Sequence, residues 1–175
     1  MKKLLCLSLF ILLVLPVQAV TLEGSVTYTV EQAREEAFKD IEWEIPKQLL
    51  RKHRKDPNYR VHVVAKKYSQ NVLTDRYINF FADGAYGYYY FDSPEYGFYY
   101  GEKGNLEHVE KRTVDIYPAK FYKYNLKGKL MAVVLVVSET ESFIYFKDGR
   151  LIAHWINDKA YDEDGNITQE RINEK

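Results

Sequence analysis

Cysteine is almost missing from this chain, and its scarcity excludes several kinds of site. The single cysteine, Cys6, lies in an apolar N-terminal run that we expect to be removed. The remaining protein would have no disulfide, no thiol nucleophile and no thiolate metal ligand. Histidine is scarce too, and no two histidines stand at a ligand-pair spacing such as H-E-x-x-H. We therefore expect no metal and no cofactor, and we interpret the four histidines as exposed or core-edge residues: His53, His62, His108 and His154.

Other reaction motifs are also missing, so no catalytic residue can be named. No serine stands in G-x-S-x-G, and no glycine opens a strand-to-helix junction as in a phosphate loop. The acidic run 162–166 fails as a calcium loop, because Ala160 and Arg171 occupy positions that should supply carboxylate oxygens. Carboxylate pairs such as Glu139 and Glu141, or Glu107 and Glu110, could serve a glycosidase only if the fold brought two carboxylates to a defined separation.

The chain also has no excess of charge of either sign. Lysine and arginine number 25, and aspartate and glutamate also number 25. Nucleic-acid binding needs a basic footprint on the protein. We therefore expect no nucleic-acid partner.

The N-terminus has the layout of a secretory signal peptide. Lys2 and Lys3 form a short positive segment, and residues 4–15 form an apolar run. A membrane-spanning helix needs about 20 apolar residues, so this run is too short to be an anchor. We predict a signal peptide at residues 1–19, in a compact arrangement typical of bacteria.

The predicted cleavage site lies between Ala19 and Val20. Cleavage there would leave residues 20–175 as a single domain with no membrane span, and with a polar C-terminal tail from about residue 168. The protein would then work in the periplasm or outside the cell.

The first predicted element of that domain is an amphipathic helix. Thr29 is the expected N-cap, and Gln32 three residues later completes a capping box. Pro46 should end or kink the helix after about four turns, and residues 47–55 can form a second short helical piece. The apolar stripe of the first helix recurs at spacings of three and four residues: Val30, Ala33, Ala37, Phe38, Ile41 and Ile45.

Strand patterns dominate the rest of the chain. Apolar residues alternate with polar ones from residue 59 to 64, which predicts a strand. Residues 130–137 are continuously apolar, as expected for a central strand covered on both faces. Between the strand-like runs 143–146 and 151–155 stands the pair Asp148-Gly149, which predicts a hairpin with a type I′ turn.

A loose repeat runs through this region. Each copy has one or two aromatics, a polar turn containing glycine, and an apolar residue two positions after the glycine. The pattern resembles the YD and MORN-like families of hairpin repeats, over about residues 96–167. That resemblance implies a meandering sheet and an interaction role, with no catalytic residue. The glycines of the four copies are Gly104, Gly128, Gly149 and Gly165.

Two segments are candidates for a binding surface. The aromatic block 86–100 could turn one strand face toward a protein or glycan ligand, or both faces could be covered and the tyrosines could only stiffen the sheet. A basic stretch could touch anionic headgroups or an acidic partner, or form a solvated helix face. The candidate aromatic surface is Tyr86, Tyr88, Tyr90, Phe98 and Tyr100, and the basic stretch is Lys47, Arg51, Lys52, Arg54, Lys55 and Arg60.

These patterns predict an α+β fold, with an N-terminal amphipathic helix packed on an antiparallel β-meander. The alternative is a half-closed barrel around the helix. For function, the sequence favours an exported, non-enzymatic binding or interaction domain of the cell envelope or secretome. The alternative is a secreted hydrolase that acts on glycan or peptide through carboxylates brought together by the fold.

Overall fold

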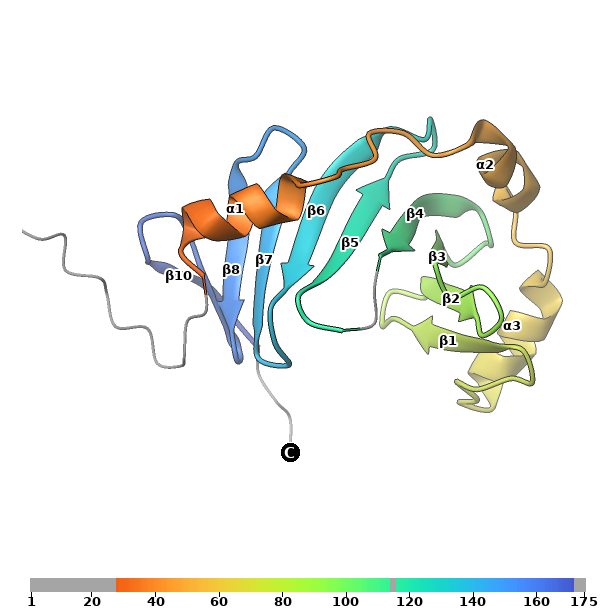
Figure 1. Ribbon diagram of the computed structural model, residues 1–175. Helices are drawn as coiled ribbons and strands as arrows, with labels where there is room; N and C mark the ends of the chain where they lie inside the picture. The colour runs from red at the N-terminus through yellow and green to blue at the C-terminus, as the bar shows by residue number, and fades with distance from the viewer. Residues whose placement is uncertain (1–27, 114–115, 172–175) are drawn as a thin grey trace, which may run out of the picture.

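The protein is built on one antiparallel sheet in which every strand pairs with its neighbours in sequence. The computed structural model describes residues 28–113 and 116–171. The predicted signal peptide and its junction at Ala19 and Val20 lie outside the described residues. Three short helices accompany an open sheet of ten strands, so the fold is mostly β with some α (Figure 1). The sheet is not closed by a pairing of its first and last strands, unlike the barrel alternative.

The elements follow one another in a simple order. The helices are α1 (Val30–Phe38), α2 (Lys47–His53) and α3 (Tyr59–Lys67). The strands are β1 (Arg76–Phe80), β2 (Tyr86–Tyr90), β3 (Tyr96–Tyr100), β4 (Leu106–Arg112), β5 (Ala119–Tyr124), β6 (Leu130–Val136), β7 (Glu141–Phe146), β8 (Leu151–Ile156), β9 (Lys159–Tyr161) and β10 (Ile167–Glu170). Within the described residues no helix is long and apolar enough to cross a membrane.

Helix α1 begins as predicted and ends early. The Thr29 side chain accepts a hydrogen bond from the Gln32 backbone at 3.2 Å, and the Gln32 side chain accepts one from the Thr29 backbone at 3.0 Å. The expectation of one four-turn helix up to Pro46 is wrong, because the backbone turns extended after Phe38 and Asp40 has a positive φ of 56°. The segment after Phe38 therefore leaves the helix axis and runs along the turns of the sheet.

Residues 59–64 belong to α3, so the predicted strand there is wrong. The alternating valines are about half exposed, whereas the buried residues His62 and Ala65 follow the three-residue spacing of a helix. Asp56 organises the first turn, because its carboxylate accepts a hydrogen bond from the Asn58 backbone at 2.9 Å and lies 2.7 Å from Nδ1 of His62. Tertiary contacts with this histidine therefore outweigh the strand preference of the valines.

Five of the hairpins share one turn geometry. In the β7–β8 turn, the Gly149 backbone N–H donates to Phe146 O at 2.9 Å, and the Phe146 N–H donates to Arg150 O at 2.9 Å. Gly149 has a positive φ of 84°, while Asp148 does not, so the loop is a three-residue type I turn with a glycine bulge and not the expected type I′ turn. The same pattern recurs at Gly84, Gly104, Gly128 and Gly165. All four glycines of the predicted repeat therefore close hairpins.

The N-terminal segment 30–56 crosses the sheet at these turns. The carbonyl oxygens of three turn glycines accept hydrogen bonds from it: Gly149 from Arg34 Nε at 2.7 Å, Gly128 from Ile45 N at 2.9 Å, and Gly104 from Asp56 N at 2.9 Å. The donors are spaced by eleven residues each.

Tyrosines at the ends of the strands add further ties to this segment. The hydroxyl of Tyr145 donates to Val30 O at 2.8 Å, and that of Tyr124 donates to Glu42 O at 2.8 Å. The Tyr100 hydroxyl lies 3.3 Å from Nδ1 of His53. Each of these tyrosines stands four residues before its turn glycine. Each copy of the repeat therefore supplies two groups that contact the N-terminal segment, the tyrosine hydroxyl and the glycine carbonyl.

Two further predictions, the central strand at residues 130–137 and the polar tail from about residue 168, differ in part from the structure. Strand β6 is central and buries one face, but its other face is only half-buried, so the expectation of cover on both faces is too strong. Residues 168–170, expected as part of a polar tail, form the exposed edge strand β10 with Ile167.

Candidate functional site

The aromatic block turns its two faces to different environments. Tyr86, Tyr88, Phe98 and Tyr100 are at most 3 % exposed and face the helices. The Tyr88 and Tyr100 rings are stacked with centroids 5.7 Å apart, and the Tyr86 hydroxyl donates to Asp56 at 2.5 Å. Burial raises the pKa values of all three tyrosines.

The candidate interaction surface from the sequence is therefore mostly core in this structure. Its fifth member, Tyr90, is half-buried and lies under the Arg76 guanidinium, 4.7 Å from the ring centroid. The residues that alternate with these five form the opposite face of the sheet, and that face carries a cavity.

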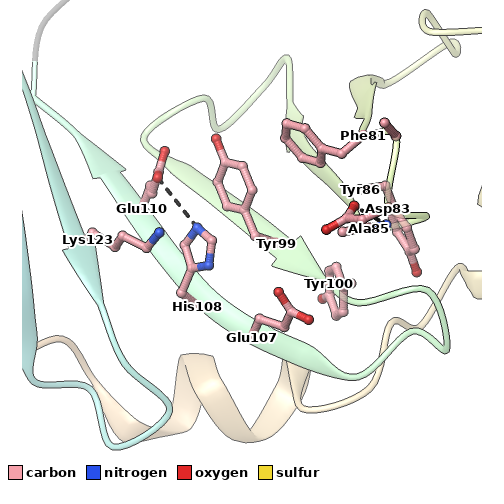
Figure 2. Close-up of a pocket in the computed structure, with 11 residues that line it drawn as sticks. Phe81, Asp83, Ala85, Tyr86, Tyr99, Tyr100, Glu107, His108, Glu110 and Lys123 are labelled. Carbon is pink, nitrogen blue, oxygen red and sulfur yellow. Dashed lines mark hydrogen bonds and ion pairs between the residues drawn. The ribbon is translucent and has the colours of Figure 1, made fainter. Parts of the chain in front are cut away.

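The cavity has a volume of about 520 Å³ and is framed by the β1–β2 turn and strands β3, β4 and β5 (Figure 2). Its wall is a row of three rings. Tyr99 lies between Phe81, at a centroid distance of 6.3 Å, and His108, at 4.4 Å with the planes only 11° apart. Gly87 makes this arrangement possible, because a Cβ at that position would lie 2.6 Å from Cδ1 of Tyr99.

One end of the cavity is polar and charged. His108 Nε2 lies 3.5 Å from Glu110 Oε1, and Glu110 stands opposite Lys123 on the neighbouring strand. Burial raises the pKa of Glu110, but hydrogen bonds from His108 and Tyr99, with the charge of Lys123, outweigh burial and hold the pKa below its usual range. Glu110 is therefore ionised near neutral pH.

Further carboxylates stand nearer the other end. Figure 2 shows Glu107 beside Tyr100, and Asp83 beyond it in the β1–β2 turn. Burial, and then the neighbouring Glu110 carboxylate, raise the pKa of Tyr99, so its hydroxyl stays protonated near neutral pH. The site thus combines an apolar aromatic wall with several acceptors and a histidine, the usual make-up of a small-ligand pocket.

The structure brings together only some of the residues singled out from the sequence. His108, Glu107 and Glu110 all line the cavity, and Tyr86 and Tyr100 contribute to its lining. The glycines inside β2 and β3 are the sequence signal that could have located it, because glycine within a strand marks close approach by another group.

The other histidines are core residues. His62 and His154 pair with Asp56 and Glu141 at 2.7 and 3.0 Å, and both pairs are almost fully buried. His53 stacks on Phe98 with centroids 3.7 Å apart. In the described part of the chain no group of three or more histidine, cysteine or acidic residues is arranged to hold a metal.

Comparison with protein-family models, curated proteins and solved structures finds no match for this chain.

Proposed function

We propose that the protein is an exported binding domain that takes a glycan unit into the cavity beside Tyr99. The observation that carries this proposal is the aromatic wall with carboxylates beside it in one cavity. A sugar ring has apolar C–H faces that pack on an aromatic ring, and hydroxyl groups at its rim that donate to carboxylates. A volume of about 520 Å³ suits one or two sugar rings.

The hairpin repeat supports the same proposal. The resemblance to YD and MORN-like repeats implies an interaction role, which we include in this proposal. Export would place the domain among the glycans of the cell envelope.

A hydrolase is the second candidate, because a histidine, a carboxylate and a hydroxyl meet in the cavity. A glycosidase needs one carboxylic acid that stays protonated near neutral pH, so its pKa must be raised. The pKa of Glu110 is shifted in the opposite direction. Glu110 is therefore unsuited to the role of the protonated acid, and we favour binding over hydrolysis.

The proposal can be tested with a glycan array and with pull-down on isolated peptidoglycan. Replacing Tyr99 by alanine removes the central ring of the aromatic wall, and Glu107→Gln removes a charge from an exposed strand position without changing the shape of the side chain. We expect Tyr99→Ala to weaken binding about tenfold and Glu107→Gln several-fold, since a stacking or charged contact contributes about 1 kcal/mol or more.

Phe91→Ala is the matched control, because Phe91 is an aromatic residue 47 % exposed outside the cavity. Its binding should equal that of the unmodified protein. Absence of any glycan ligand, or equal losses in Phe91→Ala and Tyr99→Ala, would exclude the proposal. Release of shortened glycan products, abolished by Glu110→Gln, would establish the hydrolase instead.

A further inference from the structure

A second concave surface lies at the turn edge of the sheet, beside α2. It is a groove of about 1190 Å³ between α2 with the residues that follow it and the β5–β6 turn. Leu50 and Leu106 form its buried floor, and Leu126, 56 % exposed, stands at its rim. It is a different surface from the cavity beside Tyr99 and shares no lining residue with it.

The groove is held at both ends by backbone hydrogen bonds. Before α2, Ile45 N donates to Gly128 O at 2.9 Å; after it, Leu106 N donates to Arg54 O at 3.1 Å. Two isolated bridges, Glu44 with Lys129 and Lys55 with Asn105, mark the same two points. The walls are therefore fixed before any ligand arrives, which lowers the entropy cost of binding.

The charges on these walls are all positive. Seven cations and no carboxylate line the groove, and all seven are exposed. Of these seven cations, only Lys129 has an ion pair with another described residue, Glu44. The lining cations are Lys47, Arg51, Lys52, Arg54, Lys55, Lys127 and Lys129.

We infer that this groove binds an extended acidic segment of a partner protein. Cations lie on two facing walls, so an anionic chain lying between them would be contacted from both sides. A flat layer of lipid headgroups would reach only the rim. The leucines between the cations would receive apolar side chains of the same segment, which inorganic polyanions lack.

The groove can be probed with a fluorescein-labelled peptide in which single leucines alternate with pairs of glutamates. We expect it to bind with an affinity that falls as salt rises. The double variant Arg51→Gln, Lys55→Gln removes one cation from α2 and one from the segment after it. Its affinity should fall about tenfold, since each exposed charge pair accounts for about a threefold change.

The matched control is the double variant Arg60→Gln, Lys67→Gln, which removes the same charge from α3 outside the groove. It should change the affinity less than twofold. The inference is overturned if the peptide does not bind, or if both double variants lose affinity equally. It is also overturned if the groove variant loses affinity only for polyphosphate, or only for phosphatidylglycerol vesicles. Glycan binding at Tyr99 is measured separately, so failure at either surface leaves the other test intact.

Discussion

Replacing Gly128 with alanine tests whether the N-terminal segment is fastened to the turns of the sheet. Gly128 has a positive φ of 78°, and an added Cβ would lie 2.9 Å from the carbonyl oxygen of Ile45 and 3.3 Å from Cδ1 of Leu50. Gly149 occupies the same position in the next turn-glycine hairpin, with φ of 84°, but its Cβ would meet only Cδ of Arg34 at 3.5 Å. Both substitutions therefore impose the same backbone strain. Only Gly128→Ala also places its new methyl group too close to the N-terminal segment.

The magnitudes follow from that difference. Alanine in the left-handed region costs about 1–2 kcal/mol, and this is the expected loss for Gly149→Ala. In Gly128→Ala the segment must move away, which also weakens the 2.9 Å hydrogen bond from Ile45 N to Gly128 O. That bond contributes about 1 kcal/mol, so Gly128→Ala should lose at least this much more. Effects on the unfolded chain are the same for both variants and cancel.

Urea unfolding followed by tyrosine and tryptophan fluorescence would measure the two losses. With a slope of about 2 kcal/mol per molar urea, the midpoint of Gly128→Ala should lie about 0.5 M below that of Gly149→Ala. Equal midpoints, or a lower midpoint for Gly149→Ala, would refute the reasoning. The contact between Ile45 and the β5–β6 turn would then contribute nothing to stability.

Two further outcomes are expected. Tyr145→Phe removes the hydroxyl that donates to Val30 O, and should cost about 1 kcal/mol of unfolding free energy, measured by urea unfolding. Tyr161→Phe, four residues before Gly165, is the control and should change stability by less than about 0.5 kcal/mol; equal losses would contradict this account. Burial, aided by Lys52, lowers the pKa of His53 to about 4, so the unfolded chain binds more protons than the folded one between about pH 6.5 and 4. Stability should fall by up to about 3 kcal/mol as pH falls through that range, in a pH series of urea midpoints. His53→Gln should flatten the series, and an unchanged slope would show that His53 is not the titrating group.

Much of the sheet could be predicted from local sequence signals. The glycine of each hairpin must adopt a positive φ, so the turns at Gly104, Gly128, Gly149 and Gly165 are visible as a repeat. The capping box at Thr29 is equally local. Helix α3 is different, because its valines favour a strand and the outcome depends on the burial of His62 against Asp56, Tyr86 and Tyr88.

The candidate site was less accessible to sequence reasoning. Alternation shows that Tyr88 and Tyr99 lie on opposite faces, but it does not show which face the helices cover. That depends on where the segment 30–56 docks, through contacts between residues far apart in the chain. The basic groove depends on the same placement, because one of its walls is α2 with the residues that follow it and the other is the β5–β6 turn.

The ties between the N-terminal segment and the turns bear on how the chain folds. Arg34 with Gly149, and Val30 with Tyr145, are contacts across 115 residues. Each hairpin can form from its own neighbours, whereas α1 has no surface to pack on until β6 and β7 exist. We expect the hairpins to form before α1 docks, because closing so long a loop is slow. During synthesis α1, which emerges before every strand of the sheet, would then be among the last elements to reach its final place.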